Sequence, residues 1–160
     1  MSLSDQELER YARHIVLKEI GGAGQMRLQT ARVAVIGAGG IGSPALQYLA
    51  AAGIGRLTII DDDRVDLSNL QRQTLFGTGD IGRHKGEAAA SAIQNLNPHI
   101  EVAVHLARID AGNAADFLAG HDAILDGTDN FATRLAAADA ALRLEIPLVA
   151  AAVGEFEGQL

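Results

Sequence analysis

Cysteine and tryptophan are absent from this sequence of 160 residues, and aromatic residues make up only 4% of it. Without cysteine, the chain has no disulfide framework, no thiolate nucleophile and no cysteine-ligated zinc. Because 48% of the residues are nonetheless hydrophobic, Ala, Leu, Ile and Val must fill the core. The length is that of one domain able to bury a sizeable core.

The chain also lacks an excess of positive charge. Its 13 Lys and Arg against 20 Asp and Glu give a net charge of −7, which argues against a nucleic-acid partner, because such surfaces cluster Lys and Arg. Apolar runs are too short to span a bilayer, and the polar start MSLSDQELER is unlike a secretory signal. We therefore expect a cytoplasmic protein with no membrane partner. No metal-binding pattern is predicted for the histidines, which are His14, His84, His99, His105 and His121.

Segments of strand and helix character alternate from residue 31 onward. Strands are predicted at residues 31–36, 56–61, 100–106, 122–127 and 146–153, and helices at residues 43–53, 85–97, 114–120 and 131–145. This alternation predicts an α/β fold, a Rossmann-like, doubly wound, mainly parallel sheet with helices on both faces. Alanine-rich runs are interpreted as helix faces packed close to the sheet. The ending GEFEGQL is typical of a turn leading into another strand, so we expect the domain of residues 31–160 to be incomplete at its C-terminus.

Residues 1–30 are predicted to form a separate N-terminal helical segment. The tetrapeptide SDQE is a capping box, which marks a helix start. Leu8, Tyr11 and Ile15 recur at helical spacing and give one helix an apolar face, and Arg13 falls on the opposite side. The stretch GGAGQMRLQTA is interpreted as a glycine-rich link followed by a short helix.

The segment VAVIGAGGIG carries the pattern of a phosphate-binding turn. An apolar run leads into Gly37-x-Gly39-x-x-Gly42, with a further glycine at Gly40, and a helix follows. A helix N-terminus would thus face anionic phosphates. Asp61 ends the next strand 19 residues after Gly42, close to the spacing of a carboxylate that accepts hydrogen bonds from ribose hydroxyls. This turn and this carboxylate suit NAD and ATP equally.

Polar residues after the second predicted strand favour phosphate chemistry. The stretch DLSNLQRQ places Asn69, Gln71, Arg72 and Gln73 in one loop, and Lys85 follows at a helix start. Hydride transfer needs an apolar slot for a nicotinamide, whereas nucleotidyl transfer needs cations that neutralise the departing pyrophosphate. A lysine alone is more often a solvated residue. The combination of Arg72, Lys85 and a ribose-spaced carboxylate favours ATP.

Asp129 and Asn130 follow the fourth predicted strand within LDGTDN. Since Mg²⁺ prefers carboxylate and phosphate oxygens, Asp129 is predicted to bind Mg²⁺, and Asn130 can donate to a phosphate or to the base. The alternative is that Asp129 or Thr128 caps the next helix, and both roles are compatible. An NAD-dependent oxidoreductase stays open at this point, although it would leave Asp129 and the two cations without a role.

Four segments together resemble the MoeB/ThiF family, adenylyltransferases that activate ubiquitin-like sulfur carriers and are related to the ubiquitin-activating enzymes. They are LSDQELERYARHI, VIGAGGIGSPALQYLAAAGIGRLTIIDDDRVDLSNLQRQTLF, DIGRHKGEAAASAIQNLNPHI and DGTDNFATR, and the resemblance runs from about residue 3 to residue 160. It implies that the turn holds ATP. It also implies a reaction in which the C-terminal glycine carboxylate of a carrier protein ending in Gly-Gly attacks the α-phosphate, giving an acyl-adenylate and pyrophosphate.

The resemblance further implies a role for each matching residue. Gly40 and the neighbouring glycines would lie against the nucleotide, Asp61 would bind the ribose, Asp129 would hold Mg²⁺ and Asn130 would lie near the nucleotide. Arg13 corresponds to an arginine that reaches into the neighbouring subunit's site in a homodimer. The phosphate path would be lined by Ser68, Asn69, Gln71, Arg72 and Lys85. The carrier would belong to a molybdopterin or thiamine type of pathway.

Two departures from the family pattern bear on these expectations. The pattern Tyr-Asn-Arg-Gln is found here as Tyr11-Ala12-Arg13-His14, which keeps the arginine and changes both neighbours. The family's paired CxxC zinc ligands, its carrier-docking sheet and its frequent reactive cysteine are not in this chain, so structural zinc is expected only in the missing C-terminal part. A truncated, inactive member that serves as a dimerisation partner is therefore a further possibility.

Overall fold

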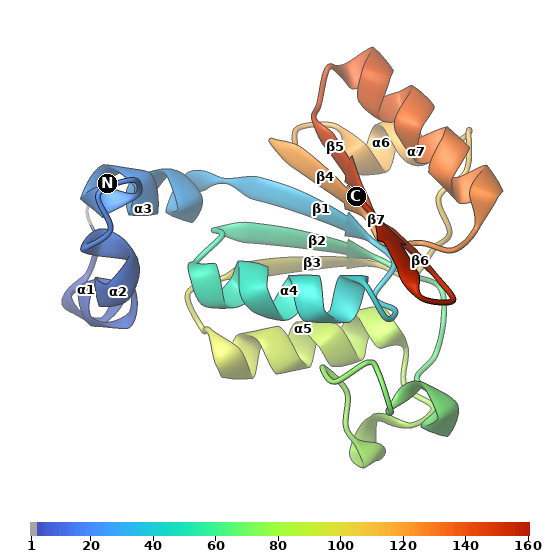
Figure 1. Cartoon of the computed structure of the whole chain (residues 1–160), viewed down its shortest axis with the longest axis horizontal. Helices are drawn as coiled ribbons and strands as arrows, with labels where there is room; N and C mark the ends of the chain where they lie inside the picture. Colours follow the sequence, from blue (N-terminus) through green and yellow to red (C-terminus); the bar gives the residue numbers. More distant parts are fainter. Residues whose placement is uncertain (1–2) are drawn as a thin grey trace.

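The computed structural model describes residues 3–160, and its central element is a five-stranded parallel sheet (Figure 1). The strands are β1 (Arg32–Ile36), β2 (Arg56–Ile60), β3 (Glu101–His105), β4 (Ala123–Asp126) and β5 (Leu148–Ala150), in the order β3-β2-β1-β4-β5. All four neighbouring pairs are parallel, so the predicted doubly wound sheet is confirmed. The strand order reverses between β1 and β4, and ligands of such sheets bind beyond the strand C-termini at that reversal.

Helices cover both faces of the sheet (Figure 1). One face carries α4 (Gly42–Ala52) and α5 (Lys85–Leu96), and the other carries α6 (Ala114–Leu118) and α7 (Phe131–Leu144). Successive side chains of a strand point to opposite faces. Accordingly, Val33 and Val35 of β1 pack in a core cluster with α4 and α5, whereas Ala34 and Ile36 pack in a second cluster with α6 and α7.

Alanines form the buried surfaces of these helices. Ala50 on α4, Ala89 on α5 and Ala137 on α7 are fully buried, and their small side chains allow the helices to approach the sheet closely. At Gly86 of α5 an added Cβ would lie 2.7 Å from Cγ1 of Val104 on β3. The interpretation of the alanine-rich runs as close-packed helix faces is therefore confirmed.

The N-terminal segment is helical but differs from the prediction in two places. The capping box at Ser4 is present, yet the predicted single helix breaks at Tyr11 into α1 (Asp5–Arg10) and α2 (Ala12–Ile15). The break accompanies burial of Tyr11, whose hydroxyl accepts a hydrogen bond of 2.8 Å from Nδ2 of Asn97. The third helix, α3 (Gly21–Thr30), begins within the predicted glycine-rich link. Its Gln25 is buried against the domain, where Nε2 donates to the carbonyl of Ala52. This packing outweighs the low helix propensity of glycine.

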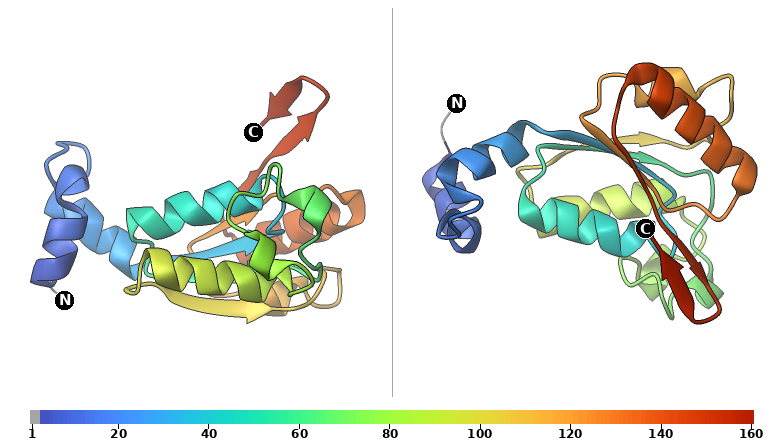
Figure 2. Two further views of the ribbon diagram at one scale, coloured as in Figure 1. Left: turned by 90° about the horizontal axis from the view of Figure 1, so that it is seen from below. Right: turned by 45° about the horizontal axis from the view of Figure 1, so that its top comes forward.

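The predicted strand at 146–153 is divided in the structure. Only β5 joins the sheet, and β6 (Ala152–Gly154) instead pairs antiparallel with β7 (Glu157–Gln159) in a hairpin that projects from the domain (Figure 2). The division falls at Ala151, whose N–H donates to the carbonyl of Asp126 at 3.0 Å and whose carbonyl accepts from Arg134. The expected turn and further strand at the end of the chain are confirmed.

The loop from β2 to α5 contains two short 3-10 turns, η1 (Leu67–Asn69) and η2 (Thr78–Asp80). Across residues 3–160, no helix combines the length and the hydropathy that crossing a membrane requires.

Candidate functional site

A cavity of about 860 Å³ lies beyond the C-terminal ends of β1, β2 and β4, where the strand order reverses. The loops that follow these three strands bring together residues that are far apart in the sequence. Nine of the predicted site residues line this cavity, namely Gly37, Gly39, Gly40, Asp61, Asn69, Arg72, Lys85, Asp129 and Asn130. The structure thus assembles most of the predicted set at one place.

The glycine turn forms the floor of the cavity, and its glycines serve different purposes. Gly37 has a φ of 83°, a backbone conformation that side chains disfavour. An added Cβ on Gly42 would lie 1.7 Å from the carbonyl oxygen of Gly37, so Gly42 permits the tight turn from behind the cavity. Gly39 and Gly40 face the cavity itself, opposite the side chains of Gln73 and Arg72.

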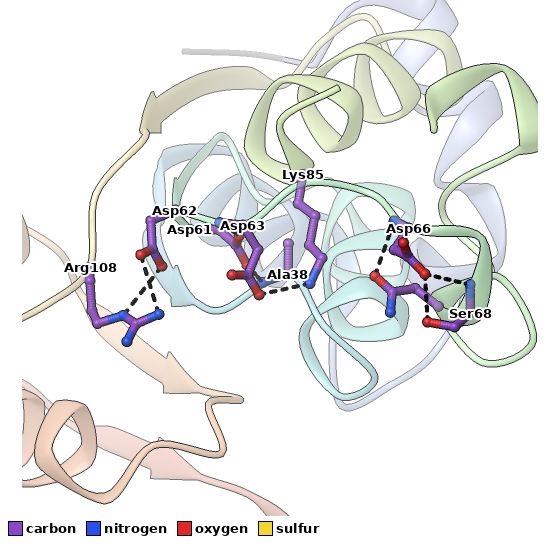
Figure 3. Close-up of polar contacts among 9 residues, drawn as sticks. Ala38, Asp61, Asp62, Asp63, Asp66, Ser68, Lys85 and Arg108 are labelled. Carbon is purple, nitrogen blue, oxygen red and sulfur yellow. Dashed lines mark hydrogen bonds and ion pairs between the residues drawn. The ribbon is translucent and has the colours of Figure 1, made fainter. Parts of the chain in front are cut away.

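Asp61 is buried and tied to the glycine turn (Figure 3). Its Oδ2 accepts a hydrogen bond of 2.7 Å from the backbone N–H of Ala38, and its Oδ1 accepts one of 2.8 Å from the N–H of Asp63. Burial raises the pKa of the Asp61 carboxyl, and the two backbone donors oppose that shift. The carboxylate is therefore held in one orientation at the cavity wall, with lone pairs left for ribose hydroxyls.

Two ion pairs flank Asp61 (Figure 3). Nζ of Lys85, a buried side chain at the start of α5, lies 3.0 Å from Oδ2 of Asp63. On the other side, a guanidinium nitrogen of Arg108 lies 3.3 Å from Oδ2 of Asp62. Asp62 and Asp63 are exposed, and each pairs with a cation that lines the cavity. Sequence reasoning missed Arg108, because nothing in its local context distinguishes it from a surface arginine.

The predicted phosphate-binding residues of the loop containing η1 fall into two groups, one that lines the cavity and one that does not. Asp66 caps this turn, and its Oδ1 accepts hydrogen bonds from the N–H and hydroxyl of Ser68 at 2.8 and 2.6 Å, which lower the pKa of the Asp66 carboxyl. Ser68 and Gln71 are exposed and do not line the cavity, whereas Asn69 and Arg72 do. A spacing of three residues, as in a 3-10 turn, therefore places Asn69 and Arg72 on the cavity side and Ser68 and Gln71 on the outer side.

The turn between β4 and α7 offers one free carboxylate. Asn130 is the N-cap of α7, since its Oδ1 accepts from the N–H of Thr133 at 3.0 Å, and Thr128 donates instead to Asp126. The alternative in which Asp129 or Thr128 caps the helix is therefore wrong. Asp129 is exposed at the cavity wall, and within residues 3–160 it makes no hydrogen bond.

Arg13 lies far from this cavity in its own chain. Its helix α2 is at the end of the sheet where the strands begin, opposite the loops that form the cavity (Figure 1). The side chain is exposed. An arginine placed there has no path to the nucleotide site of the same chain.

Comparison with known proteins agrees with this geometry. The model of the ThiF family matches residues 11–160. The chain belongs to the ThiF family. It is 50% identical over 158 residues to the probable adenylyltransferase/sulfurtransferase MoeZ of Mycobacterium tuberculosis, and 44% identical over 160 residues to the sulfur carrier protein adenylyltransferase of Thermus thermophilus. These matches cover 99% and 100% of this chain, which spans 40% and 59% of the two relatives.

A solved structure resembles most of the fold of this ThiF family member. The E. coli tRNA N6-threonylcarbamoyladenosine dehydratase TcdA, crystallised in complex with ATP, superposes with a TM-score of 0.88 at 30% sequence identity. The match covers 94% of this chain and 61% of TcdA.

Proposed function

We propose that this ThiF family member adenylates the C-terminal carboxylate of a ubiquitin-like sulfur carrier ending in Gly-Gly, with ATP as the second substrate. The names of its relatives, adenylyltransferases of sulfur carriers, support this substrate class. The ATP complex of TcdA supports ATP as the nucleotide. A molybdopterin or thiamine type of pathway is the expected setting, in the cytoplasm.

One observation carries the proposal: Arg72 and Lys85 open onto the same cavity as the glycine turn and Asp61. When a carrier carboxylate oxygen bonds to the α-phosphorus, the bond from that phosphorus to the bridging oxygen breaks and pyrophosphate leaves. Negative charge then grows on the leaving group, and fixed cations stabilise it more than they stabilise bound ATP. A hydride-transfer site would leave these two cations without a role.

The remaining cavity residues take the other parts of the nucleotide. Asp61 accepts hydrogen bonds from the ribose hydroxyls, Gly40 lies against the phosphates and Asn69 donates to a phosphate oxygen. The Oδ1 of Asn130 is used in the helix cap, so its Nδ2 is the atom available to the nucleotide. Ser68 and Gln71 stay predictions from the resemblance, outside the cavity.

Mg²⁺ fits the donors of this cavity. Mg²⁺ is usually held by one or two carboxylates together with waters and substrate phosphates, and Asp129 supplies a free carboxylate at the cavity wall. In the part of the chain that the structure describes, no group of three or more His, Cys, Asp or Glu gathers around one point. Bound there, Mg²⁺ would neutralise phosphate charge.

We further propose a homodimer in which Arg13 of each chain completes the site of the other. The distance of α2 from its own cavity favours this arrangement over a role within one chain. Residues 1–30 then serve as the helical segment that presents Arg13, and residues 31–160 as the nucleotide-binding domain.

Calorimetry tests the nucleotide and an exchange assay tests the reaction. The purified protein is expected to bind Mg–ATP and not NAD, and to exchange labelled pyrophosphate into ATP only when a carrier with a C-terminal Gly-Gly is added. Tighter binding of NAD than of Mg–ATP would overturn the nucleotide assignment. Exchange that is independent of every carrier would overturn the carrier as substrate.

A further inference from the structure

The side-chain amide of Gln73 makes no hydrogen bond to any residue that the structure describes, and of its two polar atoms only Oε1 is fully buried. The side chain lies in the loop between η1 and η2 and is only 2% exposed, yet it lines the cavity. Its Oε1 is buried with no hydrogen-bond partner, and no described residue accepts from its Nε2. Buried polar groups are nearly always hydrogen-bonded, and leaving one unpaired costs free energy.

The loop does not need a glutamine at this position for its own structure. The hydrogen bonds that Gln73 does make are those of its backbone, from its N–H to the carbonyl of Asn69 at 3.0 Å and from the N–H of Phe76 to its carbonyl at 3.1 Å. Any residue other than proline provides these two bonds. An apolar side chain of the same length would fill the same space without an unpaired amide.

The amide faces the glycine turn. Its Nε2 lies 3.8 Å from the point that a Cβ on Gly39 would occupy, and Cδ and Nε of Arg72 lie 3.6 Å from the corresponding point at Gly40. Two consecutive residues of the loop thus lie opposite two consecutive glycines of the turn. Phosphate oxygens held by the turn would lie beside both side chains.

We propose that Gln73 is a further nucleotide-binding residue, whose Nε2 donates a hydrogen bond to the phosphate oxygen that lies over Gly39. This assignment rests on the proposed function. Phosphate oxygens are acceptors only, so the amide must present Nε2 to them. Burial holds the short side chain in place, so it orients the phosphate, whereas the longer and exposed Arg72 supplies positive charge.

Two variants of Gln73 test this role. Gln73→Met keeps the length and removes both polar atoms, and Gln73→Glu keeps the shape and replaces the donor by a carboxylate oxygen. Thr74→Glu is the matched control, because Thr74 is exposed next to Gln73 and does not line the cavity. Calorimetry measures the dissociation constants of α,β-methylene-ATP with Mg²⁺ and of adenosine, and thermal melts of the ligand-free proteins report folding.

Loss of one hydrogen bond to a charged group is expected to weaken binding of the Mg²⁺–ATP analogue by about 10-fold in Gln73→Met, and further in Gln73→Glu. Adenosine affinity should stay within about 2-fold in both, because adenosine has no phosphate for the amide to contact. The ligand-free Tm of Gln73→Met should be equal to or above that of the wild type, since an unpaired amide has been replaced. Thr74→Glu should bind the analogue as the wild type does.

Several results would overturn this role of Gln73. The first is unchanged analogue affinity in Gln73→Met, with or without a lower ligand-free Tm. The second is an equal loss of affinity for adenosine and for the analogue. The third is an equal loss of analogue affinity in Thr74→Glu. If the wild-type protein fails to bind the analogue at all, the proposed function itself fails and the role of Gln73 fails with it. Binding by the wild type together with equal binding by the variants refutes only Gln73.

Discussion

Gly42, the first residue of α4, is the position where a single methyl group should do most damage to the candidate site. An added Cβ would lie 1.7 Å from the carbonyl oxygen and 2.8 Å from the carbonyl carbon of Gly37. Both are backbone atoms, so they cannot rotate away as a side chain would. The first distance must open to at least 3.0 Å, below which real Cβ contacts are essentially never seen, so the turn or the start of α4 must move.

Overpacking of this kind costs about 1–3 kcal/mol and occasionally more, and we expect about 3 kcal/mol because backbone forms the obstacle. The higher helix propensity of alanine offsets at most about 1 kcal/mol. In a domain of this size each kcal/mol lowers Tm by roughly 2–4 °C. Gly42→Ala is therefore expected to lower Tm by roughly 4–12 °C, measured by circular dichroism without ligand.

Gly40→Ala is the matched control in the same turn. Its added Cβ would lie 3.6 Å from the flexible side chain of Arg72, an ordinary van der Waals distance. Its Tm should stay within about 2 °C of the wild type, but its methyl group projects into the cavity and should weaken binding of Mg–ATP in calorimetry. Equal Tm values for the two alanine variants would refute the steric argument. Unchanged Mg–ATP binding by Gly40→Ala would refute the placement of phosphates over the turn.

Three further predictions concern charged residues of the proposed site. Arg72→Ala or Lys85→Ala should slow carrier-dependent ATP–pyrophosphate exchange by about 10²-fold or more, which is the effect of removing one group that stabilises developing charge. A normal exchange rate in both variants would contradict the proposed roles of these residues. Arg13→Ala and Asp129→Ala should each be inactive. Mixing the two variants should restore part of the activity, because one site of a mixed dimer then has an intact cavity and an intact arginine. Confirmed heterodimers without recovered activity would exclude action in trans. Burial raises the pKa of Asp61 above its ordinary value of 3.8, so the folded protein binds a proton at this carboxyl more tightly than the unfolded chain does. The resulting stabilisation is lost as the pH rises through the raised pKa. The free energy of unfolding of Asp61→Asn, measured in urea, should accordingly increase relative to that of the wild type as the pH rises through this range. Parallel pH profiles for the two proteins would contradict the raised pKa.

Several parts of the site could be predicted because they depend on spacing along the chain. The glycines of the turn, from Gly37 to Gly42, act through their own backbone. Asp61 directly follows β2, which lies beside β1 in the parallel sheet. The C-termini of parallel strands meet at one edge, which also brings Asp129 to the same place. The helix end at Gly53, with a φ of 86°, follows the same local rule.

Other features depended on residues that are distant in sequence. Tyr11 breaks the first helix because it packs against Gly53 and accepts a hydrogen bond from Asn97, 86 residues away. The strand that was expected to run through residues 146–153 divides where Arg134 and the carbonyl of Asp126 hold Ala151. The helix and strand propensities of neighbouring residues cannot predict such contacts.

The sequence by itself determined the alternating fold, the phosphate-binding turn and the ribose-spaced Asp61, because each follows from the order and spacing of neighbouring residues. Only the tertiary structure decided that Asp63 pairs with Lys85, 22 residues later, and that Ser68 donates to the capping Asp66 outside the cavity. It also decided that Gln73 is buried with its amide facing Gly39. Whether a polar side chain is solvated, paired or held toward a ligand depends on which distant backbone packs against it, and that is settled when the sheet and its loops come together.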